Sequence, residues 1–222
     1  MQDSVVVVVA GGAPLRPDVA TLLPADARVL AADGGVAHAR SLGLPVATIV
    51  GDLDSAAPED LEEAVAAGAR VERHPTDKDA TDLELTLDAA LELEPARVVV
   101  LADDGGRLDH LLSALLLLGS PKYARIRLDA QVGPALVHVI RDERELAGEP
   151  GELVSLLALH GPAAGVRTDG LAYPLDGETL QAASSRGVSN VFAGREARVS
   201  VERGVLLAVR PGPESTEAAE AK

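Results

Sequence analysis

Four apolar runs in the first half of the chain are continuous rather than alternating with polar residues. They cover residues 4–10, 28–32, 46–50 and 97–102. Continuous apolar runs are typical of strands that are buried on both faces of a sheet. Small residues, Gly or Asp follow each run, which indicates that each strand ends in a tight turn.

The segments between these runs carry apolar residues at helical spacing. After Thr81, apolar residues recur at i, i+4, i+7 and i+8, and after Arg107 leucines recur at i, i+3, i+4 and i+7. Strands that alternate with helices predict an α/β fold, with a doubly wound parallel sheet and helices on both faces. Ligands of such sheets bind beyond the carboxyl ends of the strands, where the Gly and Asp residues lie.

The pattern changes after about residue 123. Helical spacing is largely lost, and short strand-like runs separated by Gly and Pro take its place, at 135–140, 153–159, 197–202 and 205–210. Such runs predict a small all-β sandwich or barrel. We therefore expect an α/β domain over residues 1–130, a β-sandwich domain over 131–211 and a flexible tail over 212–222.

Composition narrows the classes of function. The formal net charge of −15 disfavours nucleic acid and membrane surfaces as partners and favours a bound cation. One Phe, two Tyr and no Trp leave no platform for base stacking, and the absence of Cys excludes disulfides and thiolate chemistry. No signal peptide and no stretch of membrane-spanning length is recognised, so we expect a cytoplasmic protein.

The chain carries two acidic clusters, the first of which directly follows a predicted strand. In GDLDS (residues 51–55), Asp52 and Asp54 are two positions apart, so an extended backbone would place both carboxylates on one side. Adjacent carboxylates repel each other unless a cation lies between them. The alternative is a polar loop in which Asp54 or Ser55 caps the helix after Pro58. This motif alone leaves both interpretations open.

The second cluster is DKDATD (residues 77–82). Thr81 begins a capping-box pattern, which together with the helix dipole explains Asp82. It does not explain the acids before Thr81, among them Asp79. Magnesium usually takes one or two carboxylates together with substrate phosphates, and Lys78 would then pair with a phosphate or serve as a counter-charge. The two clusters together favour a magnesium site.

The segment DDGGRLDH (residues 103–110) complements these acids. Its glycines, the second of which is Gly106, follow a strand and open a helix, where free N–H groups favour an anion. Arg107 can bind phosphate oxygens with two N–H groups. The alternative is an ordinary turn in which Arg107 pairs with a neighbouring acid.

The turn formed by Asp33, Gly34 and Gly35 fits a ligand contact or a plain tight turn equally well. No P-loop motif and no G-x-G-x-x-G motif occurs in the chain. The residues by themselves predict phosphoryl or nucleotidyl transfer at a magnesium site on the rim of a parallel sheet, and they leave the acceptor open.

Three motifs, GDLDS, DKDATDLELTLDAAL and GGRLDHLL, resemble in order and spacing those of the bacterial thiamine pyrophosphokinases. In the second half, GLAYPLDGETL followed by SSRGVSNVFAG is similar to the C-terminal signature of that family. The resemblance implies magnesium-dependent transfer of the pyrophosphoryl group of ATP to the hydroxyl of thiamine, which gives thiamine diphosphate and AMP. It also implies an ATP- and magnesium-binding α/β domain, a thiamine-binding β-sandwich and a homodimer with active sites between subunits.

The same resemblance implies roles for individual residues. The magnesium ligands would be Asp52, Asp54 and Asp79. Arg107 would bind the triphosphate beside Gly106, with the following residues nearby: Lys78, Thr81, Asp82 and the Asp33-Gly34-Gly35 turn. Asp109 would lie close to the transferred group, and either Asp79 or Asp109 would be the general base. Ser189 and Asn190 would contact the aminopyrimidine of thiamine.

The chain also departs from the family pattern. Asp103 and Asp104 stand where small or hydroxyl residues are more common, and in the absence of Trp either Tyr173, Phe192 or an aliphatic wall must contact thiamine. Two other functions stay open at this point. One is a diphosphokinase for another heterocyclic alcohol, such as a hydroxymethylpterin, and the other is a nucleotide- or thiamine-binding module without turnover.

Overall fold

The computed structural model describes residues 4–212, which fall into two compact units. Within the described residues, the first unit comprises 4–117 and 125–133, and the second comprises 118–124 and 134–212. The chain thus passes between the units more than once near residues 118–134. Apart from Gly212, the expected tail lies outside the described residues.

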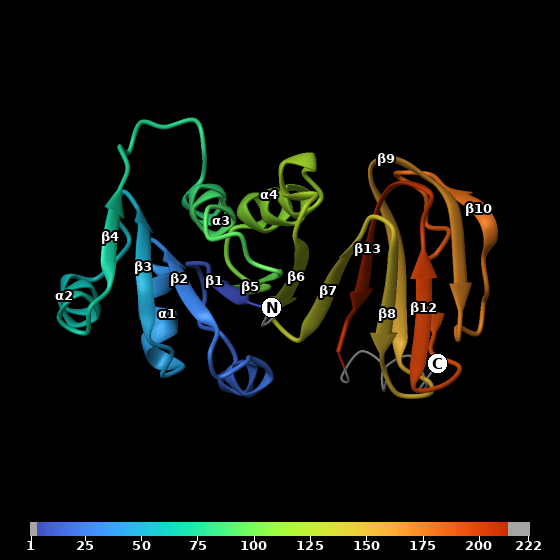
Figure 1. The fold of residues 1–222 in the computed structure, drawn as a ribbon, viewed down its shortest axis with the longest axis horizontal. Helices are drawn as coiled ribbons and strands as arrows, with labels where there is room; N and C mark the ends of the chain where they lie inside the picture. Colours follow the sequence, from blue (N-terminus) through green and yellow to red (C-terminus); the bar gives the residue numbers. More distant parts are fainter. Residues whose placement is uncertain (1–3, 213–222) are drawn as a thin grey trace. The chain divides into compact units, whose positions relative to one another are not determined.

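The first unit is a parallel sheet with helices. In the described residues its elements are β1 (Val5–Val9), η1 (Pro17–Leu22), β2 (Arg28–Ala32), α1 (Gly35–Ser41), β3 (Val46–Gly51), α2 (Pro58–Ala66), β4 (Arg70–Arg73), α3 (Asp82–Leu91), β5 (Arg97–Ala102), α4 (Leu108–Leu118) and β6 (Arg127–Val132). The strand order is β4-β3-β2-β1-β5-β6, and every neighbouring pair is parallel. Figure 1 shows α1 and α3 on opposite sides of this sheet.

The strand order reverses beside β1. The chain runs outward from β1 through β2 and β3 to β4, and then returns to add β5 and β6 on the other side of β1. Val8 of β1 pairs with Leu30 of β2 and with Val100 of β5, so the carboxyl ends of these strands meet at one edge. This reversal is the topological switch point at which such sheets bind ligands.

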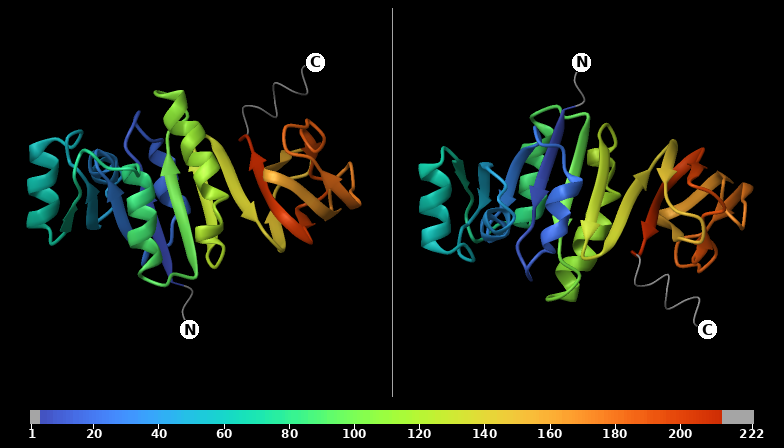
Figure 2. Two further views of the ribbon diagram at one scale, coloured as in Figure 1. Left: turned by 90° about the horizontal axis from the view of Figure 1, so that it is seen from above. Right: turned by 90° about the horizontal axis from the view of Figure 1, so that it is seen from below.

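The four strands and the two helices predicted for this half are confirmed, and so is the doubly wound fold. The apolar runs are buried because both faces of the sheet are covered: Val7, Val8, Val9 and Ala31 are completely inaccessible to solvent. Figure 2 shows the helices along the two faces from above and from below. Two strands, β4 and β6, were missing from the prediction.

The second unit contains all-β structure apart from one short turn of helix. Its described elements are η2 (Pro121–Tyr123), β7 (Ala135–Ile140), β8 (Glu143–Ala147), β9 (Leu153–Asp169), β10 (Asp176–Leu180), β11 (Asn190–Val191), β12 (Glu196–Ser200) and β13 (Arg203–Arg210). Antiparallel pairing gives the order β7-β13-β9-β12-β8, and β10 and β11 also pair with β9.

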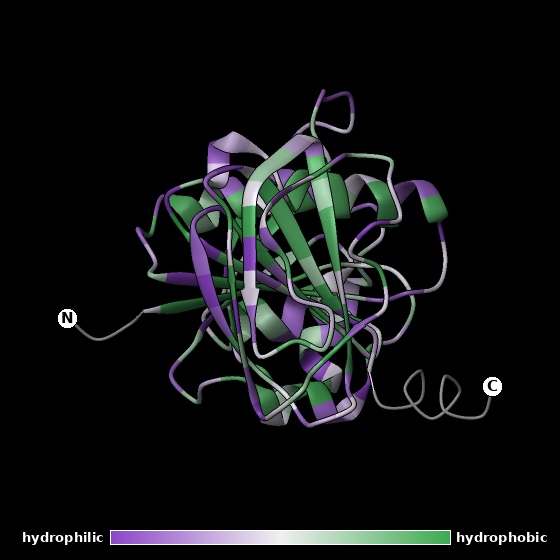
Figure 3. Ribbon diagram, turned by 90° about the vertical axis from the view of Figure 1, so that its right-hand side faces the viewer, coloured by the Kyte–Doolittle hydropathy of each residue, from purple (hydrophilic) through white to green (hydrophobic). Residues whose placement is uncertain are grey.

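The main apolar cluster of this unit consists of aliphatic side chains around Phe192. Phe192 is 1% exposed and packs in a cluster with residues such as Leu156 and Leu206. Figure 3 shows both hydrophobic and hydrophilic stretches along the strands. No helix within residues 4–212 is long and apolar enough to cross a membrane.

Candidate active site

Three carboxylates converge at the carboxyl end of the parallel sheet. Asp33 follows β2, Asp52 follows β3, and Asp82 is the first residue of α3. One oxygen of each lies within 4.8 Å of the oxygens of the other two. We call these three residues the acidic triad. The adjacency of β2 and β3 brings the first two together, and the packing of α3 on both strands adds the third.

Gly51, the last residue of β3, makes room for the triad. A Cβ atom built on it would lie 2.8 Å from Asp82 Oδ1 and 3.1 Å from Asp33 Cβ. Its φ of +148° also favours glycine. Asp33 itself has a φ of 45°, a left-handed conformation that Asp tolerates better than most residues and that is common at functional sites.

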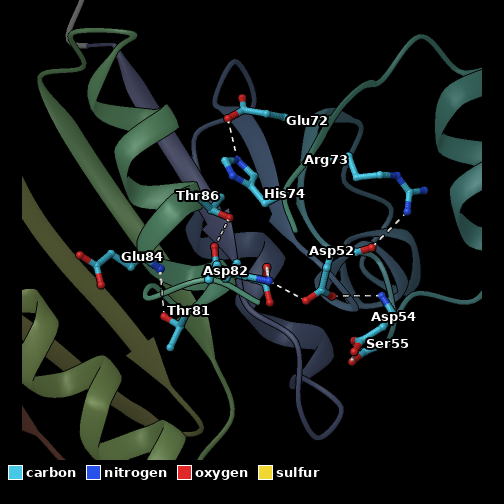
Figure 4. A network of polar contacts seen from close by, with 11 residues as sticks. Asp52, Asp54, Ser55, Glu72, Arg73, His74, Thr81, Asp82, Glu84 and Thr86 are labelled. Carbon is cyan, nitrogen blue, oxygen red and sulfur yellow. Dashed lines mark hydrogen bonds and ion pairs between the residues drawn. The ribbon is translucent and has the colours of Figure 1, made fainter. Parts of the chain in front are cut away.

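Lys78 bridges two members of the triad. Its Nζ lies 2.5 Å from Asp52 Oδ2 and 3.1 Å from Asp82 Oδ1, and its side chain is 14% exposed. Burial lowers the pKa of Lys78, but the hydrogen bonds and charges of both carboxylates outweigh burial and raise it overall. The hydrogen bond from Lys78 in turn lowers the pKa of Asp52. Figure 4 shows Asp52 and Asp82 directed toward each other within this network.

Asp33 is the most buried carboxylate of the triad. Burial, followed by the nearby charges of Asp82 and Asp54, raises its pKa, although a hydrogen bond from Ser55 acts in the opposite direction. Its Oδ1 is buried and has no hydrogen-bond partner among residues 4–212. A buried carboxylate oxygen without a donor, beside two further carboxylates, is the environment that a hard divalent cation prefers. The residues present therefore fit a magnesium ion.

Asp54 and Asp79 are not part of the triad. The backbone from Asp52 to Asp54 is not extended, contrary to the condition on which the sequence argument depended, because β3 ends at Gly51 and Leu53 has a φ of 68°. Asp54 instead turns back, and its N–H donates to Asp52 Oδ1 at 3.2 Å. Asp79 is exposed on the loop before α3. A ligand role for these two acids stays a prediction from the family resemblance.

The two helix starts differ from each other. Thr81 caps α3 as predicted, with its Oγ1 accepting from the N–H of Glu84 at 3.2 Å. The alternative interpretation of GDLDS, in which Asp54 or Ser55 caps α2, is wrong: the N-cap residue is Ala57, which makes no side-chain hydrogen bond, and Pro58 begins the helix. The acids of GDLDS are therefore not needed for capping.

Arg107, at the start of α4, pairs with Asp109. Its Nη2 lies 2.6 Å from Asp109 Oδ2 and its Nε lies 3.2 Å from Asp109 Oδ1. This hydrogen bond is the main reason why the pKa of Asp109 falls to about 2. Arg107 follows Gly106, whose φ is +73°, and its side chain is 70% exposed. Arg107 can therefore exchange the carboxylate of Asp109 for a phosphate, and the exchange leaves no buried charge without a partner.

In the second unit, the structure gives Asn190 a backbone partner. Its side chain is buried, accepts hydrogen bonds from the N–H groups of Tyr173 (3.0 Å) and Val191 (2.9 Å), and donates to the carbonyl of Tyr173 (2.7 Å). Ser189 is exposed, and its N–H donates to Ser155 Oγ at 3.0 Å. The thiamine contact expected of Ser189 and Asn190 stays a prediction.

The two aromatic candidates for a contact with thiamine differ in their exposure to solvent. Tyr173 is 67% exposed, whereas Phe192 is a core residue. Phe192 is therefore unsuited to contact a ligand, and Tyr173 is the aromatic side chain that solvent can reach in this part of the unit.

Sequence reasoning assigned Asp82 to the helix start and left Asp33 undecided. A signal for both existed, because Asp33 directly follows a predicted buried strand and Asp82 directly follows Thr81. The missing information was that β2 and β3 are neighbours.

A parallel sheet with acids, a lysine and an arginine-bearing glycine turn at its carboxyl end is typical of enzymes that transfer phosphoryl groups. Two family models match the chain: the thiamin pyrophosphokinase catalytic domain over residues 19–129, and the thiamin pyrophosphokinase vitamin B1 binding domain over residues 137–206. The chain belongs to the thiamine pyrophosphokinase family, and the resemblance inferred from its motifs is confirmed. It is thus an enzyme of a family that transfers a pyrophosphoryl group from ATP to thiamine.

Individual relatives agree with this assignment. The thiamine pyrophosphokinase of Bacillus subtilis (strain 168) is 26% identical over 212 residues, which cover 91% of this chain and 96% of the relative. The fold is similar to a crystal structure of thiamine pyrophosphokinase from B. subtilis (TM-score 0.83, 22% identity, 95% of this chain and 100% of that one). It is also similar to thiamin pyrophosphokinase from Candida albicans (TM-score 0.75, 14% identity, 93% and 89%).

Proposed function

We propose that this chain transfers the pyrophosphoryl group of ATP to thiamine, with magnesium held by the acidic triad. The observation that carries this proposal is the triad itself, with the buried, unpartnered Oδ1 of Asp33. Asp54 and Asp79, on the same rim, would complete the metal environment. A magnesium ion bound there would neutralise triphosphate charge and orient the β-phosphorus.

The residues of the chain position the reactants for an in-line displacement. The hydroxyl oxygen of thiamine loses its proton to solvent and forms a bond to the β-phosphorus. The bond from that phosphorus to the oxygen of the α-phosphate breaks, so AMP leaves. Arg107 and Lys78 place positive charge on the phosphates, which is the main contribution expected for this loose transition state. Asp109 is a poor proton acceptor while Arg107 holds its pKa at about 2.

The proposed function is tested by AMP release from ATP with thiamine, at millimolar magnesium and after chelation. We expect AMP only when thiamine and magnesium are both present, and a loss on the order of 10²-fold in kcat for Asp82→Asn. Asp77→Asn, in an exposed acid of the same loop, is the matched control and should keep the wild-type rate. Asp79→Asn tests the rim separately, and we expect it to lose turnover while the fold is kept.

The alternatives give different results in the same assay. AMP formed only with a hydroxymethylpterin would identify another acceptor, and ATP or thiamine binding by calorimetry without AMP would identify a binding module. The homodimer and the cytoplasmic location stay predictions, and sedimentation of the purified chain tests the first.

A further inference from the structure

Leu53, between the two acids of GDLDS, has a backbone conformation that is rare for leucine. Among residues 4–212, six residues other than glycine have a positive φ, and only two of them, Asp33 and Leu53, are buried. Asp33 belongs to the acidic triad, and Leu53 directly follows another member of it, Asp52. Such torsions persist where the surrounding structure enforces them, and they cluster at functional sites.

The side chain of Leu53 enforces this torsion. It is 9% exposed and packs in an apolar cluster that includes residues of β2, β3 and α1. The other buried members of the cluster are Ala31, Val36, Ile49, Ala56 and Ala69. A left-handed leucine is unfavourable because its Cβ crowds the backbone, and burial of the side chain offsets this penalty because it removes apolar surface from water. The packing therefore holds a backbone conformation that leucine alone would leave.

The turn at Leu53 determines how Asp52 is held. Because of this turn, the N–H of Asp54 reaches Asp52 Oδ1 at 3.2 Å, as Figure 4 shows. An aspartate that accepts from the N–H two residues further on forms an Asx turn. The other carboxylate oxygen, Oδ2, lies 2.5 Å from Lys78 Nζ, and the carbonyl of Asp52 accepts from Arg73 at 3.2 Å. Without the left-handed torsion, Asp52 Oδ1 would lose its backbone donor.

We propose that Leu53 is a positioning residue for the magnesium site, because its buried side chain holds the turn that directs the carboxylate of Asp52 into the acidic triad. The inference rests on the proposed function, since it assumes that the triad binds magnesium. Leu53 has no polar side-chain atom to offer a metal or a phosphate, so it acts through Asp52. A carboxylate that is already oriented loses less freedom when an ion binds. The affinity for magnesium therefore depends on the torsion at position 53.

The test measures magnesium binding to the full chain by calorimetry, with substitutions that separate torsion from side-chain volume. Leu53→Ala removes the apolar anchor and keeps the penalty for a positive φ, so we expect at least about a tenfold loss of affinity, the value of one hydrogen bond. Leu53→Gly removes still more of the side chain, yet glycine adopts a positive φ without a penalty. It should therefore bind magnesium at least about threefold more tightly than Leu53→Ala. A role in packing alone predicts the opposite order.

Leu61→Ala is the matched control, because Leu61 of α2 packs against the same apolar cluster. This control should lower the midpoint of urea unfolding and leave the affinity for magnesium at the wild-type value. In the assay of AMP release, Leu53→Ala should raise the magnesium concentration that gives half-maximal rate and leave the KM for thiamine unchanged. A general loss of stability would not produce this separation.

Two further variants keep the test decisive if Leu53→Ala fails to fold. Leu53→Val and Leu53→Met both keep an apolar anchor, but the β-branched valine tolerates a positive φ poorly. Leu53→Val should therefore lose at least about tenfold in affinity, whereas Leu53→Met should keep the wild-type affinity.

Unchanged affinity in Leu53→Ala or Leu53→Val, or weaker binding by Leu53→Gly than by Leu53→Ala, overturns the proposal. A wild type that binds no magnesium refutes the proposed metal site and this inference together. Equal binding by wild type and all variants refutes this inference alone, and absence of AMP from a wild type that binds magnesium refutes the proposed activity alone.

Discussion

Asn190→Ala removes a side chain that joins two segments of the second unit. The amide of Asn190 makes hydrogen bonds to the N–H and carbonyl of Tyr173 and to the N–H of Val191. Asn190 is 4% exposed, so water replaces these bonds poorly. Each net hydrogen bond contributes about 0.5–1.5 kcal/mol, and three give about 1.5–4.5 kcal/mol. Since Tyr173 itself reaches solvent, we expect a loss of about 2–3 kcal/mol.

Urea unfolding followed by circular dichroism measures this loss. Asn190→Ala should lower the midpoint without changing the slope, because the surface exposed on unfolding is nearly the same. Ser189→Ala is the matched control: the side chain is exposed, and the N–H that donates to Ser155 Oγ is kept. The control should stay within about 0.5 kcal/mol of wild type.

Steady-state kinetics separate a positioning role of Asn190 from direct contact with thiamine. If Asn190 acts by holding Tyr173 in place, Asn190→Ala raises the KM for thiamine, leaves the KM for ATP unchanged and loses stability as well. A variant with wild-type stability and a raised KM for thiamine would refute the structural reasoning, because the amide of Asn190 would then make its hydrogen bonds with the ligand.

Three further predictions concern the first unit. Lys78→Met should lower the free energy of unfolding by about 2 kcal/mol in chelator, a value between those for exposed and buried ion pairs. Millimolar magnesium should reduce the difference in stability between wild type and variant. If magnesium stabilised both proteins equally, Lys78 and magnesium would not share the acidic triad. Gly35→Ala should cost at least about 3 kcal/mol in a thermal or urea melt, because its Cβ would overlap a carbonyl oxygen of β1, whereas Gly194→Ala, with open space around it, should be neutral. The carboxyl of Asp109 should titrate near pH 2 by NMR, and its pKa should move toward 3.8 in Arg107→Gln. Since the pKa is lowered in the folded state, the stability from this pair is present above about pH 4 and is lost as the pH falls toward 2. An unshifted titration in the variant would disprove the pairing.

The strands that the sequence predicts are those with both faces buried. β4 escaped prediction because it is an edge strand with all four residues exposed, and its sequence RVER shows no apolar run. β6 escaped because it carries Asp129 and Gln131, both buried. The carboxylate of Asp129 is tolerated because Arg97 of β5 donates to it at 2.7 Å, a contact between strands that local sequence does not reveal.

The candidate site was predictable in location but only partly in membership. Loops after parallel strands share one edge, so acids there were expected to meet. Which acids meet depends on the strand order and on single backbone torsions, such as the left-handed Leu53, which turns Asp54 away from the extended geometry assumed for it. The hydrogen bonds of Asn190 could not be predicted from the sequence either, since its partner Tyr173 lies 17 residues away.

The bridge made by Lys78 has a consequence for how the protein matures. Because an ammonium group of the chain itself already balances the carboxylates it touches, the loops can settle into their working arrangement during synthesis, before any ion arrives. Under the proposed function, metal scarcity would then stop the activity of the enzyme without unfolding it, and activity would return when the ion is resupplied.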